Sequence, residues 1–305
     1  MDKHAYLIMV HNNFEQVKLL LRLLDDKRND IFIHIDKRVN NVDFIKEDLM
    51  SVIRISGLYF SERIKVQWGG KSLADAQVLL LKTAIDGRYN YYHMLSGADL
   101  PLKTQDYIHN FFDVNHGKEF IHFCNEEDNK RFRERYRYFY FLQEFIGRPS
   151  DNFKYKISSF IQRCCVKLQK IFGVDRLENN EFKYIAGANW FSITHNLSTY
   201  IVENEQLIDK LFYKTLCPDE SFLQTIVYNS KFYVKCYHKE FDGDYKSVMR
   251  YIDWRRGNPY VFRDSDYEDL IDSNFLFARK FDLTVDEKVI YKIYEYLKLK
   301  NNEVV

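Results

Sequence analysis

The chain has 305 residues, 46% of them hydrophobic and 29% charged, which is enough for a packed core in one large domain or two small ones. The formal net charge of +1 excludes a global field that attracts nucleic acid, so any basic site must be local. Aromatic residues reach 17%; they suit stacking on sugars or bases, although an AT-rich genome explains them better.

The beginning of the chain, MDKHAYLIMVHNNF, enters a predicted strand almost at once and contains no cleavable apolar segment. No stretch approaches the roughly 18 consecutive apolar residues of a membrane span. The 5 cysteines show no Cys-x-x-Cys spacing, and their odd number fits reduced thiols. These features predict a cytoplasmic protein.

The first half of the chain alternates strand and helix patterns. Short apolar runs at Tyr6–Val10 and Asp30–Asp36 bracket a helical pattern at Phe14–Leu24, a β-α-β spacing that predicts a right-handed parallel crossover. Further short strands are expected at Val52–Ile55 and Ile64–Val66.

A helix is predicted next, at Ser72–Asp86, and then a buried strand at Tyr91–Leu95. A parallel sheet binds its ligand beyond the carboxyl ends of its strands. Val10-His11, Asp36-Lys37-Arg38 and Ser96–Asp99 follow three of the predicted strands, so we expect them to converge on one crevice.

The second half is less regular. It predicts strands and helices at Phe120–Phe123 (strand), Ile157–Phe172 (helix), Trp190–Thr194 (strand), Pro218–Asn229 (helix), Phe232–Cys236 (strand) and Val285–Leu299 (helix). With 4 prolines, no Ser/Gly linker and no internal repeat, nothing marks a boundary. We therefore expect one mixed α/β domain.

Two kinds of motif resemble phosphate-binding or metal-binding sites. WGGKSL, at Trp68–Leu73, lacks the earlier glycine of a phosphate-binding loop and is interpreted as a turn before the Ser72 helix. The Asp-x-Asp pairs at Asp242–Asp244 and Asp264–Asp266 have the spacing that holds divalent cations, but neither follows an apolar strand of the first half. We therefore expect neither pair to bind a metal, and we expect Asp264 to cap the helix that follows.

Three charged segments have both plain and functional interpretations. RFRERYRYFYF, at Arg131–Phe141, is either a solvated helix face or a surface for an anionic or carbohydrate acceptor; the neutral net charge argues against nucleic acid. In CPDESFLQTIV, Pro218 and its two acids suit the start of a helix. Near the end of the chain, fixed cations could neutralise a diphosphate without a metal: Arg250, Arg255, Arg256, Arg263, Arg279 and Lys280.

Several segments together resemble the core-2/I-branching β-1,6-N-acetylglucosaminyltransferases, a family that includes the peptide O-xylosyltransferases (glycosyltransferase family 14). In family order they are LIMVHNN, IFIHIDKR, VQWGGKSLADAQ, YYHMLSGADLPLKTQDYI, GANWFSIT, CPDESFLQTIV, YIDWRRGNP and LFARKFD. The segment from about 126 to 180 matches poorly.

The resemblance implies a GT-A-type, Rossmann-like nucleotide-sugar fold with a mixed, mainly parallel sheet. It also implies a UDP-sugar donor, inversion at the anomeric carbon and no metal cofactor. The single domain, 1–305, then divides into a UDP-binding half (1–125), a divergent acceptor-side insert (126–180) and a catalytic and diphosphate-binding half (181–305).

Site residues carry over by their positions in the matching motifs. Glu220 of the Pro-Asp-Glu motif is implied to be the catalytic base, Asp36 to bind the uracil ring beside Val10, and Lys280 to hold the diphosphate. The arginine that would bind the diphosphate together with Lys280 is Arg255 or Arg256, and Arg263 is a less favoured candidate. The remaining implied residues are Arg38, Trp68, Ser96 and Asp99 for UDP, and Trp190, Asp219, Trp254 and Arg279 for the donor or acceptor pocket.

N-acetylglucosamine is the first expected donor sugar, then xylose and other hexoses. The Golgi anchor, stem and disulfides of animal members are missing, which favours a bacterial enzyme that glycosylates a lipid-linked surface glycan. Such an enzyme would contact the inner face of the membrane through its basic aromatic segment. The alternatives are a metal-dependent transferase that uses an Asp-x-Asp pair, a non-catalytic carbohydrate- or nucleotide-binding relative, and an RNA-binding protein that uses Arg131–Arg137.

Overall fold

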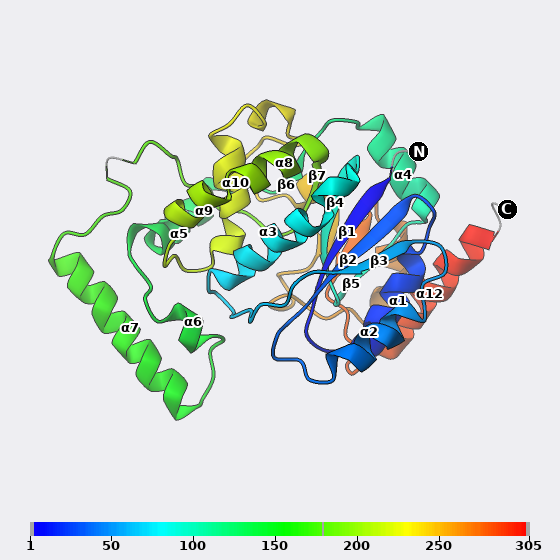
Figure 1. Cartoon of the computed structure of the whole chain (residues 1–305), viewed down its shortest axis with the longest axis horizontal. Helices are drawn as coiled ribbons and strands as arrows, with labels where there is room; N and C mark the ends of the chain where they lie inside the picture. The colour runs from blue at the N-terminus through cyan, green and yellow to red at the C-terminus, as the bar shows by residue number, and fades with distance from the viewer. Residues whose placement is uncertain (1–2, 179, 303–305) are drawn as a thin grey trace.

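A computed structural model describes residues 3–178 and 180–302 (Figure 1). Its larger sheet has the strand order β3-β2-β1-β4-β7-β6, and a smaller sheet has the order β5-β9-β8. The larger sheet contains β1 (His4–Val10), β2 (Asn29–Ile35), β3 (Gly57–Phe60), β4 (Tyr91–Ser96), β6 (Phe120–Ile121) and β7 (Phe191–Thr194). The smaller contains β5 (Asp99–Pro101), β8 (Arg250–Ile252) and β9 (Phe277–Arg279).

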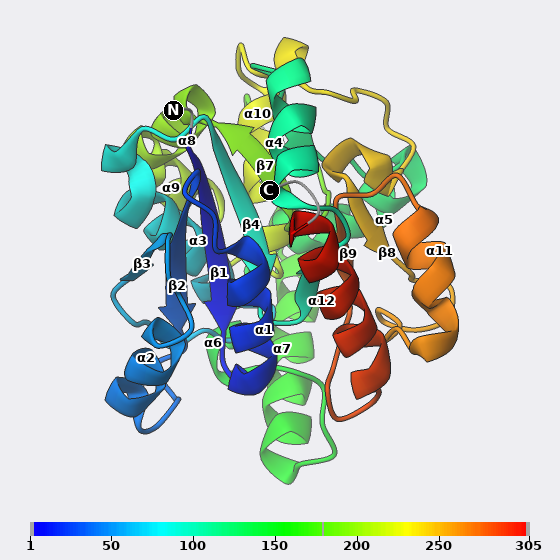
Figure 2. The same cartoon turned by 90° about the vertical axis from the view of Figure 1, so that its right-hand side faces the viewer.

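The helices surround the larger sheet and extend to one side of it (Figures 1 and 2). They are α1 (Phe14–Leu24), α2 (Val42–Met50), α3 (Ser72–Ala84), α4 (Gln105–Val114), α5 (Glu126–Arg137), α6 (Gln143–Ile146), α7 (Phe153–Ile171), α8 (His195–Glu203), α9 (Glu205–Leu211), α10 (Phe222–Tyr228), α11 (Tyr267–Asp272) and α12 (Glu287–Asn302). The 3₁₀ turns are η1 (Ile85–Gly87), η2 (Pro218–Glu220), η3 (Tyr233–Lys235), η4 (Tyr245–Val248) and η5 (Asp264–Asp266).

Strand β1 lies in the middle of the parallel part of the larger sheet. It pairs in parallel with β2 and β4, and β2 pairs in parallel with β3, whereas β7 runs antiparallel to β4 and β6. The register places Val10 beside Ile35, so the carboxyl ends of β1 and β2 lie at one edge. The predicted α/β class with a mixed, mainly parallel central sheet is confirmed.

The core has two halves because the side chains of β1 alternate between the faces of the sheet. Tyr6, Ile8 and Val10 join the apolar cluster that contains residues of α1 and α12. Ala5 and Leu7 join the cluster that contains residues of α3, α8 and α10. Figure 2 shows α1 and α12 side by side over the first face. Burial on both faces explains why β1 reads as an almost unbroken apolar run.

Two strand predictions were wrong at the sheet edge. Residues 52–55 and 64–66 lie outside strands, and the third parallel strand, β3, lies between them. The Asp25 carboxylate accepts backbone N–H groups from residues 54 to 56 and fixes that segment as a loop. Val66 donates its N–H to the Asp36 carboxylate, which holds the second segment at the ligand edge instead.

A third predicted strand, Phe232–Cys236, is also wrong, since this segment forms the turn η3 and a single bridge from Cys236 to Glu119. Helix α2 was not predicted, whereas β1, α1, β2, α3, β4, α7, β7 and α12 lie close to their predicted positions. All five cysteines are free thiols. None of the described helices is both long and apolar enough to cross a bilayer.

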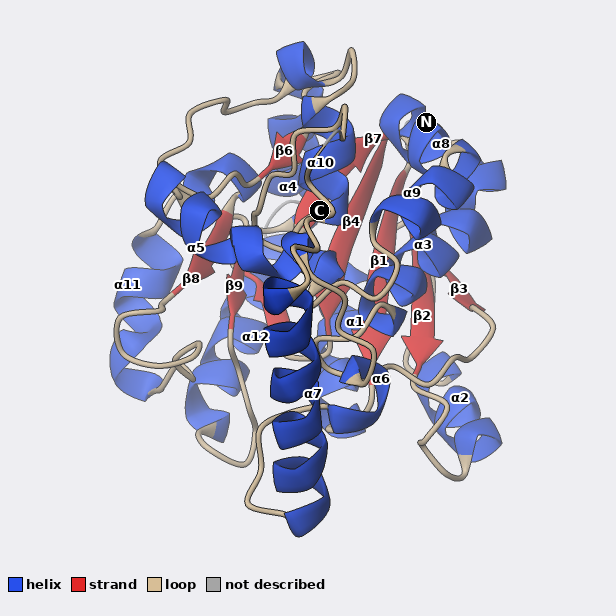
Figure 3. Cartoon of the chain, turned by 90° about the vertical axis from the view of Figure 1, so that its left-hand side faces the viewer, coloured by secondary structure: helices blue, strands red, loops and turns tan. Residues whose placement is uncertain are grey.

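The segment that resembles the family least forms a separate lobe. Helices α5, α6 and α7 occupy it, and α7 runs along the outer edge of the molecule, away from the sheet (Figures 1 and 3). Helix α7 packs against α6. This lobe faces the same end of the molecule as the loops that follow the parallel strands, as Figure 3 shows.

Candidate active site

Asp36, at the end of β2, lies in the expected crevice. Its carboxylate pairs with Arg38 at 2.8 Å and accepts the backbone N–H of Val66 at 3.1 Å. Burial opposes ionisation, but these hydrogen bonds outweigh it and hold the pKa of Asp36 below its ordinary value. The N–H of Asp36 also donates to the carbonyl of Val10. Val10, Asp36 and Arg38 therefore form one unit with a charged carboxylate.

The loops after β1, β4 and β9 are tied together beside this unit. Gln16 donates from Nε2 to the carbonyls of Gly97 and Phe281, at 3.0 and 3.1 Å. The N–H of Phe281 donates in turn to Ala98, and Asn13 donates to Asp282. Lys280 is thereby placed at the carboxyl ends of the parallel strands, next to the residues that follow β1 and β4.

A partly buried cluster around the buried Asp99 supports the residue before Lys280. Arg279 forms an ion pair with Asp99 at 3.2 Å and contacts the Ser96 hydroxyl at 3.3 Å. Its guanidinium also stacks on Trp190, 4.0 Å from the ring centroid. Ser96, Asp99, Trp190 and Arg279 were predicted separately, and the structure brings them into direct contact. The cluster fixes the backbone from which the Lys280 side chain extends.

Lys280 is a partly buried cation without an ion-pair partner among the described residues. Burial lowers its pKa, and the charges of Arg279 and Arg148 act in the same direction, partly offset by Asp282. Burial and the charge of Arg148 likewise lower the pKa of His11. Arg148 comes from the loop after α6, so the insert adds a cation to the crevice that sequence reasoning missed.

The two arginines predicted as partners of Lys280 are placed differently. Arg256 pairs with Asp253 at 2.5 Å and with Asp266 at 2.6 Å, and its guanidinium lies over Tyr260. Its charge is therefore already balanced. Arg255 is an exposed residue whose backbone N–H donates to Asp253. The cations whose charges act on Lys280 are instead Arg279 and Arg148.

The Pro-Asp-Glu motif forms η2, a turn that precedes α10 instead of continuing it. Ser221, with φ −158°, separates the turn from the helix, so the predicted helix at Pro218–Asn229 is interrupted and both carboxylates lie outside α10. The N–H of Cys217 donates to the carbonyl of Gly69 at 2.8 Å. Val66, three residues before Gly69, donates its N–H to the Asp36 carboxylate. The turn that is bonded to Gly69 therefore lies on the same side of the sheet as the crevice.

Glu220 and Asp219 have different surroundings within this turn. The Glu220 carboxylate pairs with Arg135 of α5 at 2.6 Å, and its side chain is 40% exposed. Asp219 is buried; Asn189 donates to its Oδ2 at 3.3 Å, while its Oδ1 has no hydrogen-bond partner among the described residues. Glu220 is therefore the accessible carboxylate, and Asp219 lies beneath it.

The GANW segment positions the same turn. Gly187 donates its N–H to the carbonyl of Glu220 at 2.8 Å. An added Cβ at Gly187 would lie 1.9 Å from the carbonyl oxygen of His122, so only glycine permits this approach. The backbone of Glu220 is thus attached to the segment that leads into β7.

Tyr245 connects the carboxylate and cation parts of the site. It is partly buried, its hydroxyl interacts with the Trp254 side chain, and its pKa is raised mainly by burial. The charges of both Glu220 and Arg279 act on its hydroxyl, with opposite signs. Tyr245 therefore connects Trp254 to Glu220 and to Arg279. Tyr245 was not among the residues predicted from the sequence.

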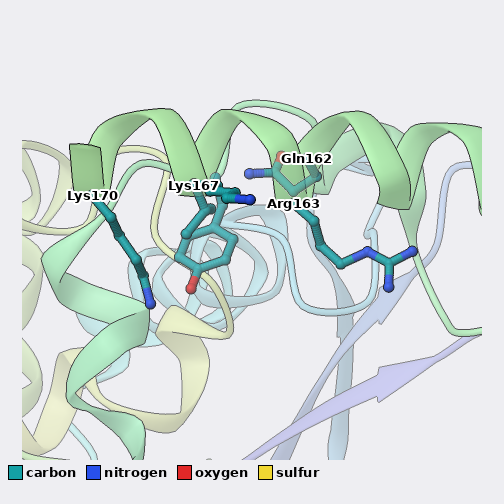
Figure 4. A pocket seen from close by; sticks show the side chains of 6 residues that line it. Gln162, Arg163, Lys167 and Lys170 are labelled. Atoms are coloured by element: carbon teal, nitrogen blue, oxygen red, sulfur yellow. The ribbon is translucent and has the colours of Figure 1, made fainter. Parts of the chain in front are cut away.

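Two pockets lie at the insert, one between it and the core and one within the insert itself. The larger, of about 450 Å³, is lined by Trp68, Arg135, Cys217 and residues of α6 and α7. The smaller, of about 340 Å³, is lined by Tyr140, Gln162, Arg163, Val166, Lys167 and Lys170, and Figure 4 shows it beneath α7. The larger pocket reaches Arg135, the partner of Glu220, so a molecule bound there would lie beside the carboxylate.

The Asp-x-Asp pairs are engaged elsewhere. Asp242 pairs with His238, Asp264 with Lys292 and Asp266 with Arg256. The prediction that Asp264 caps the next helix was wrong, because Asp266 accepts the N–H of Arg263 at the start of η5. Within the described ranges, no group of three or more His, Cys, Asp or Glu side chains is arranged to hold a metal ion.

The arginines of the basic aromatic segment are mostly paired. Arg131 pairs with Asp128, Arg135 with Glu220 and Arg137 with Asp175. Tyr136 is buried. The segment is therefore neither a plain solvated face nor an open basic patch, since α5 directs one arginine into the site.

We expect the buried Asp219 to make stability depend on pH. Burial, followed by the charge of Glu220, raises the pKa of Asp219 to about 7. Below about pH 4 the group is protonated in both states, whereas between pH 4 and 7 the unfolded carboxyl ionises first and the folded state loses stability. Asp219→Asn should remove this penalty, on the order of 4 kcal/mol at pH 8.

Thermal unfolding of both proteins from pH 4 to 8 measures this difference. The advantage of Asp219→Asn should grow as the pH rises and level off above 7. Asp151→Asn, which changes an exposed carboxyl before α7, is the matched control and should show no such trend. An Asp219→Asn advantage that stays constant across the range would contradict the expected ionisation.

Comparison with known proteins agrees on one group of enzymes. The family described as Core-2/I-Branching enzyme matches residues 4–270, a range that ends before Lys280. Xylosyltransferase 2 of Rattus norvegicus is 25% identical over 320 residues, covering 94% of this chain and 32% of the relative. Xylosyltransferase oxt of Drosophila melanogaster is 23% identical over 319 residues, covering 96% and 33%. The chain spans about a third of the length of these relatives.

Solved structures show weaker similarity. Mouse xyloside xylosyltransferase 1, in its apo form, aligns with a TM-score of 0.39 and 12% identity, covering 91% of this chain and 97% of that one. TarS residues 1–349 of S. aureus, in complex with UDP, align with a TM-score of 0.29 and 15% identity, covering 40% and 35%.

Proposed function

Because the chain belongs to the Core-2/I-branching enzyme family and is a glycosyltransferase, we propose that it transfers a sugar from a UDP-sugar to a glycan hydroxyl with inversion and without a metal cofactor. The observation that carries the proposal is that one side of the sheet holds both an accessible carboxylate, Glu220, and a cation, Lys280, that has no ion-pair partner among the described residues. The family match supports the reaction class; the donor sugar, the acceptor and the inversion are proposed.

The UDP would lie along the ends of the parallel strands. Asp36 offers a charged acceptor for a uracil N–H, because its pKa lies below its ordinary value. Lys280, with the nearby charges of Arg279 and Arg148, offers positive charge for the diphosphate. Arg279 is already paired with Asp99, whereas Lys280 and Arg148 form no ion pair within the part of the chain that the structure describes.

In the proposed reaction, an acceptor oxygen attacks C1 of the donor sugar while the bond from C1 to the β-phosphate oxygen breaks. Glu220 takes the proton of the attacking hydroxyl, and UDP leaves with the electron pair of the broken bond. Arg135 holds the Glu220 carboxylate in place before the acceptor binds. Lys280 stabilises the negative charge that builds on the leaving phosphate.

The acceptor is proposed to occupy the larger pocket. Trp68 offers an aromatic face, and Arg135 and Arg163 offer positive charge. This lining suits a glycan attached to an anionic carrier, such as a lipid-linked oligosaccharide. Since the pocket is built largely from residues 126–180, the divergent insert is proposed to select the acceptor.

Both xylose and N-acetylglucosamine remain donor candidates. The similar curated proteins are named xylosyltransferases, which places xylose first in the proposal, ahead of the N-acetylglucosamine expected from the sequence. Because this chain spans about a third of the relatives' length, their names alone do not identify its acceptor.

A donor screen tests the function. A bound donor stabilises the folded state by about 2.7 kcal/mol at a hundredfold excess over its dissociation constant. UDP-xylose and UDP-N-acetylglucosamine should therefore raise the unfolding temperature, and ADP-glucose, as a control, should not. Failure of every UDP-sugar to stabilise the protein would refute the proposed donor class.

Metal independence is tested in the same reaction mixtures. The cations of the crevice and the protein partners of the Asp-x-Asp carboxylates support transfer without a metal. UDP-sugar hydrolysis or transfer should therefore continue in excess EDTA at an unchanged rate. Loss of activity that Mn²⁺ restores would favour a metal-dependent transferase, and stabilisation by UDP-sugars without any turnover would favour a binding protein.

A further inference from the structure

The outer face of helix α7 is apolar. Its 19 residues place Phe153, Ile157, Phe160, Ile161, Cys164, Leu168 and Ile171 at spacings of three, four and seven, which form one stripe along a helix. These side chains are exposed, with Phe153 at 76%, Phe160 at 60% and Ile171 at 67%. The stripe is about 28 Å long at the usual helical rise.

The opposite face attaches α7 to the protein through polar groups. Gln162 is the buried residue of the helix, and its Oε1 accepts the N–H of Leu142 at 2.7 Å. Gln169 accepts the N–H of Phe139 at 2.8 Å and donates to the carbonyl of the same residue at 2.9 Å. The helix is therefore reversed relative to an ordinary surface helix, since its polar side faces inward and its apolar side faces outward.

The patch extends beyond both ends of the helix. Phe145, in α6, is 78% exposed, and Phe172, directly after α7, is 79% exposed. Soluble proteins scatter such side chains singly over their surface and seldom arrange them in one continuous band. Figures 1 and 3 show α7 at the outer edge of the molecule, where a flat surface could reach it.

Positive charge borders this apolar stripe. Helix α7 contains Lys154, Lys156, Arg163, Lys167 and Lys170 and no acidic residue. Lys156 pairs with Asp151 and Lys170 with Glu134, whereas the other three form no ion pair among the described residues. Arg163 and Lys167 also line the pocket beneath the helix, as Figure 4 shows.

We propose that α7 is an interfacial helix that lies in the plane of an anionic lipid bilayer. The apolar stripe would enter the boundary between headgroups and acyl chains, and the cations at its border would contact anionic headgroups. A second copy of the chain is a poorer occupant, because pairing two such helices would bring cations of the same sign together.

From the sequence, the membrane contact was expected at Arg131–Phe141; in the structure, α7 suits this contact better. In α5, Arg131, Arg135 and Arg137 are paired with carboxylates, and they offer less free charge than α7 does. The larger pocket lies between the insert and the core, and both pockets are partly lined by α7, so a bilayer under α7 would present a lipid-linked molecule beside them. The bilayer contact itself does not depend on the proposed transfer reaction.

Co-sedimentation with vesicles tests the contact. The full chain should bind vesicles of phosphatidylcholine mixed with phosphatidylglycerol, bind pure phosphatidylcholine at least tenfold more weakly, and lose binding as salt is raised. Phe160→Ser with Ile161→Ser should weaken binding at least tenfold. Phe44→Ser, which changes a 72% exposed phenylalanine of α2, is the matched control and should bind as the unchanged chain does.

A second measurement reports insertion directly. The emission of a tryptophan placed at position 160, in Phe160→Trp, should shift to shorter wavelength when anionic vesicles are added. A tryptophan placed by Phe44→Trp should show no shift. UDP binding, measured in solution, should be unchanged in each variant, which separates failure of this contact from failure of the proposed function.

Three outcomes would overturn the proposal. The first is equal binding of the unchanged chain to neutral and anionic vesicles, or no binding to either. The second is full vesicle binding by the Phe160→Ser, Ile161→Ser variant. The third is a concentration-dependent dimer that this variant abolishes, without vesicle binding by the unchanged chain, which would assign the stripe to a second copy.

Discussion

Replacing Glu220 with glutamine is expected to lower sugar transfer by about 10²–10⁴-fold while leaving UDP binding unchanged. Glutamine keeps the size of the side chain but cannot take a proton from the acceptor hydroxyl. Glu220 is the half-exposed carboxylate of the turn and borders the pocket through Arg135, whereas Asp219 is buried beneath it. Turnover and UDP affinity, measured on the same protein samples, test the assignment.

The matched control for this variant is Glu134→Gln. Glu134 pairs with Lys170 at 2.6 Å, so its loss also removes an ion pair of the insert, but away from η2. Transfer by Glu134→Gln should stay within a few fold of the unchanged chain. If Glu220→Gln retained near-full turnover, Glu220 would not be the base; if it lost UDP binding as well, the substitution would have disturbed the fold of the site.

The second large effect is expected at Lys280. Lys280→Ala should weaken UDP binding by about 10- to 100-fold, since hydrogen bonds to charged groups contribute roughly 1.5–3 kcal/mol. Binding of uridine, which lacks phosphates, should hardly change. The reason is the position of Lys280 at the ends of the parallel strands, without an ion-pair partner among the residues described. Calorimetry with UDP and uridine measures both affinities.

Arg256→Ala serves as the control for Lys280→Ala. Arg256 is held by Asp253 and Asp266, so its removal should leave the ratio of UDP to uridine affinity unchanged. Arg148→Ala should lower the ratio of UDP to uridine affinity, because it removes a positive charge close to Lys280. Equal losses of UDP and uridine binding in Lys280→Ala would remove its role at the diphosphate. A lower ratio in Arg256→Ala would restore the sequence-based choice of partner.

The parallel half of the fold could be predicted because its signals are local. The apolar runs of β1, β2 and β4 are buried on both faces, and each ends on polar residues that mark the ligand edge. From this pattern, the meeting of Val10, Asp36 and Ser96 at one edge follows directly. The position of the short strand β3 was predicted wrongly. The Asp25 carboxylate holds the loop before β3 by accepting backbone N–H groups, and such a long-range contact leaves no pattern in the local sequence.

The sequence predicted the α7 helix but not its orientation. Its periodicity defines an apolar and a polar face, and burial of the apolar face is the usual outcome. In the structure, Gln162 and Gln169 bind backbone groups at Leu142 and Phe139, so the polar face turns inward. Nothing within the helix distinguishes the two orientations, because the deciding partners lie in another segment.

The candidate site was predictable where motifs carried it and incomplete where the insert contributes. Glu220, Asp36 and Lys280 come from matching motifs. Arg135 and Arg148 come from the segment that matches poorly, and only their contacts in three dimensions reveal them. Arginines in a charged surface helix, as in α5, look alike in sequence whether they reach a site or face solvent.

The two attachments of Glu220 have different origins. Its backbone is fastened to Gly187, whose close approach to His122 belongs to the sheet, whereas its carboxylate is held by Arg135 of the lobe. The proposed proton acceptor is therefore anchored to the core through its backbone and to the lobe through its carboxylate. Under the proposed function, grafting the lobe of a homologue onto this core should exchange the acceptor preference and leave the chemistry in place, which would make the lobe a unit for building chimeric transferases.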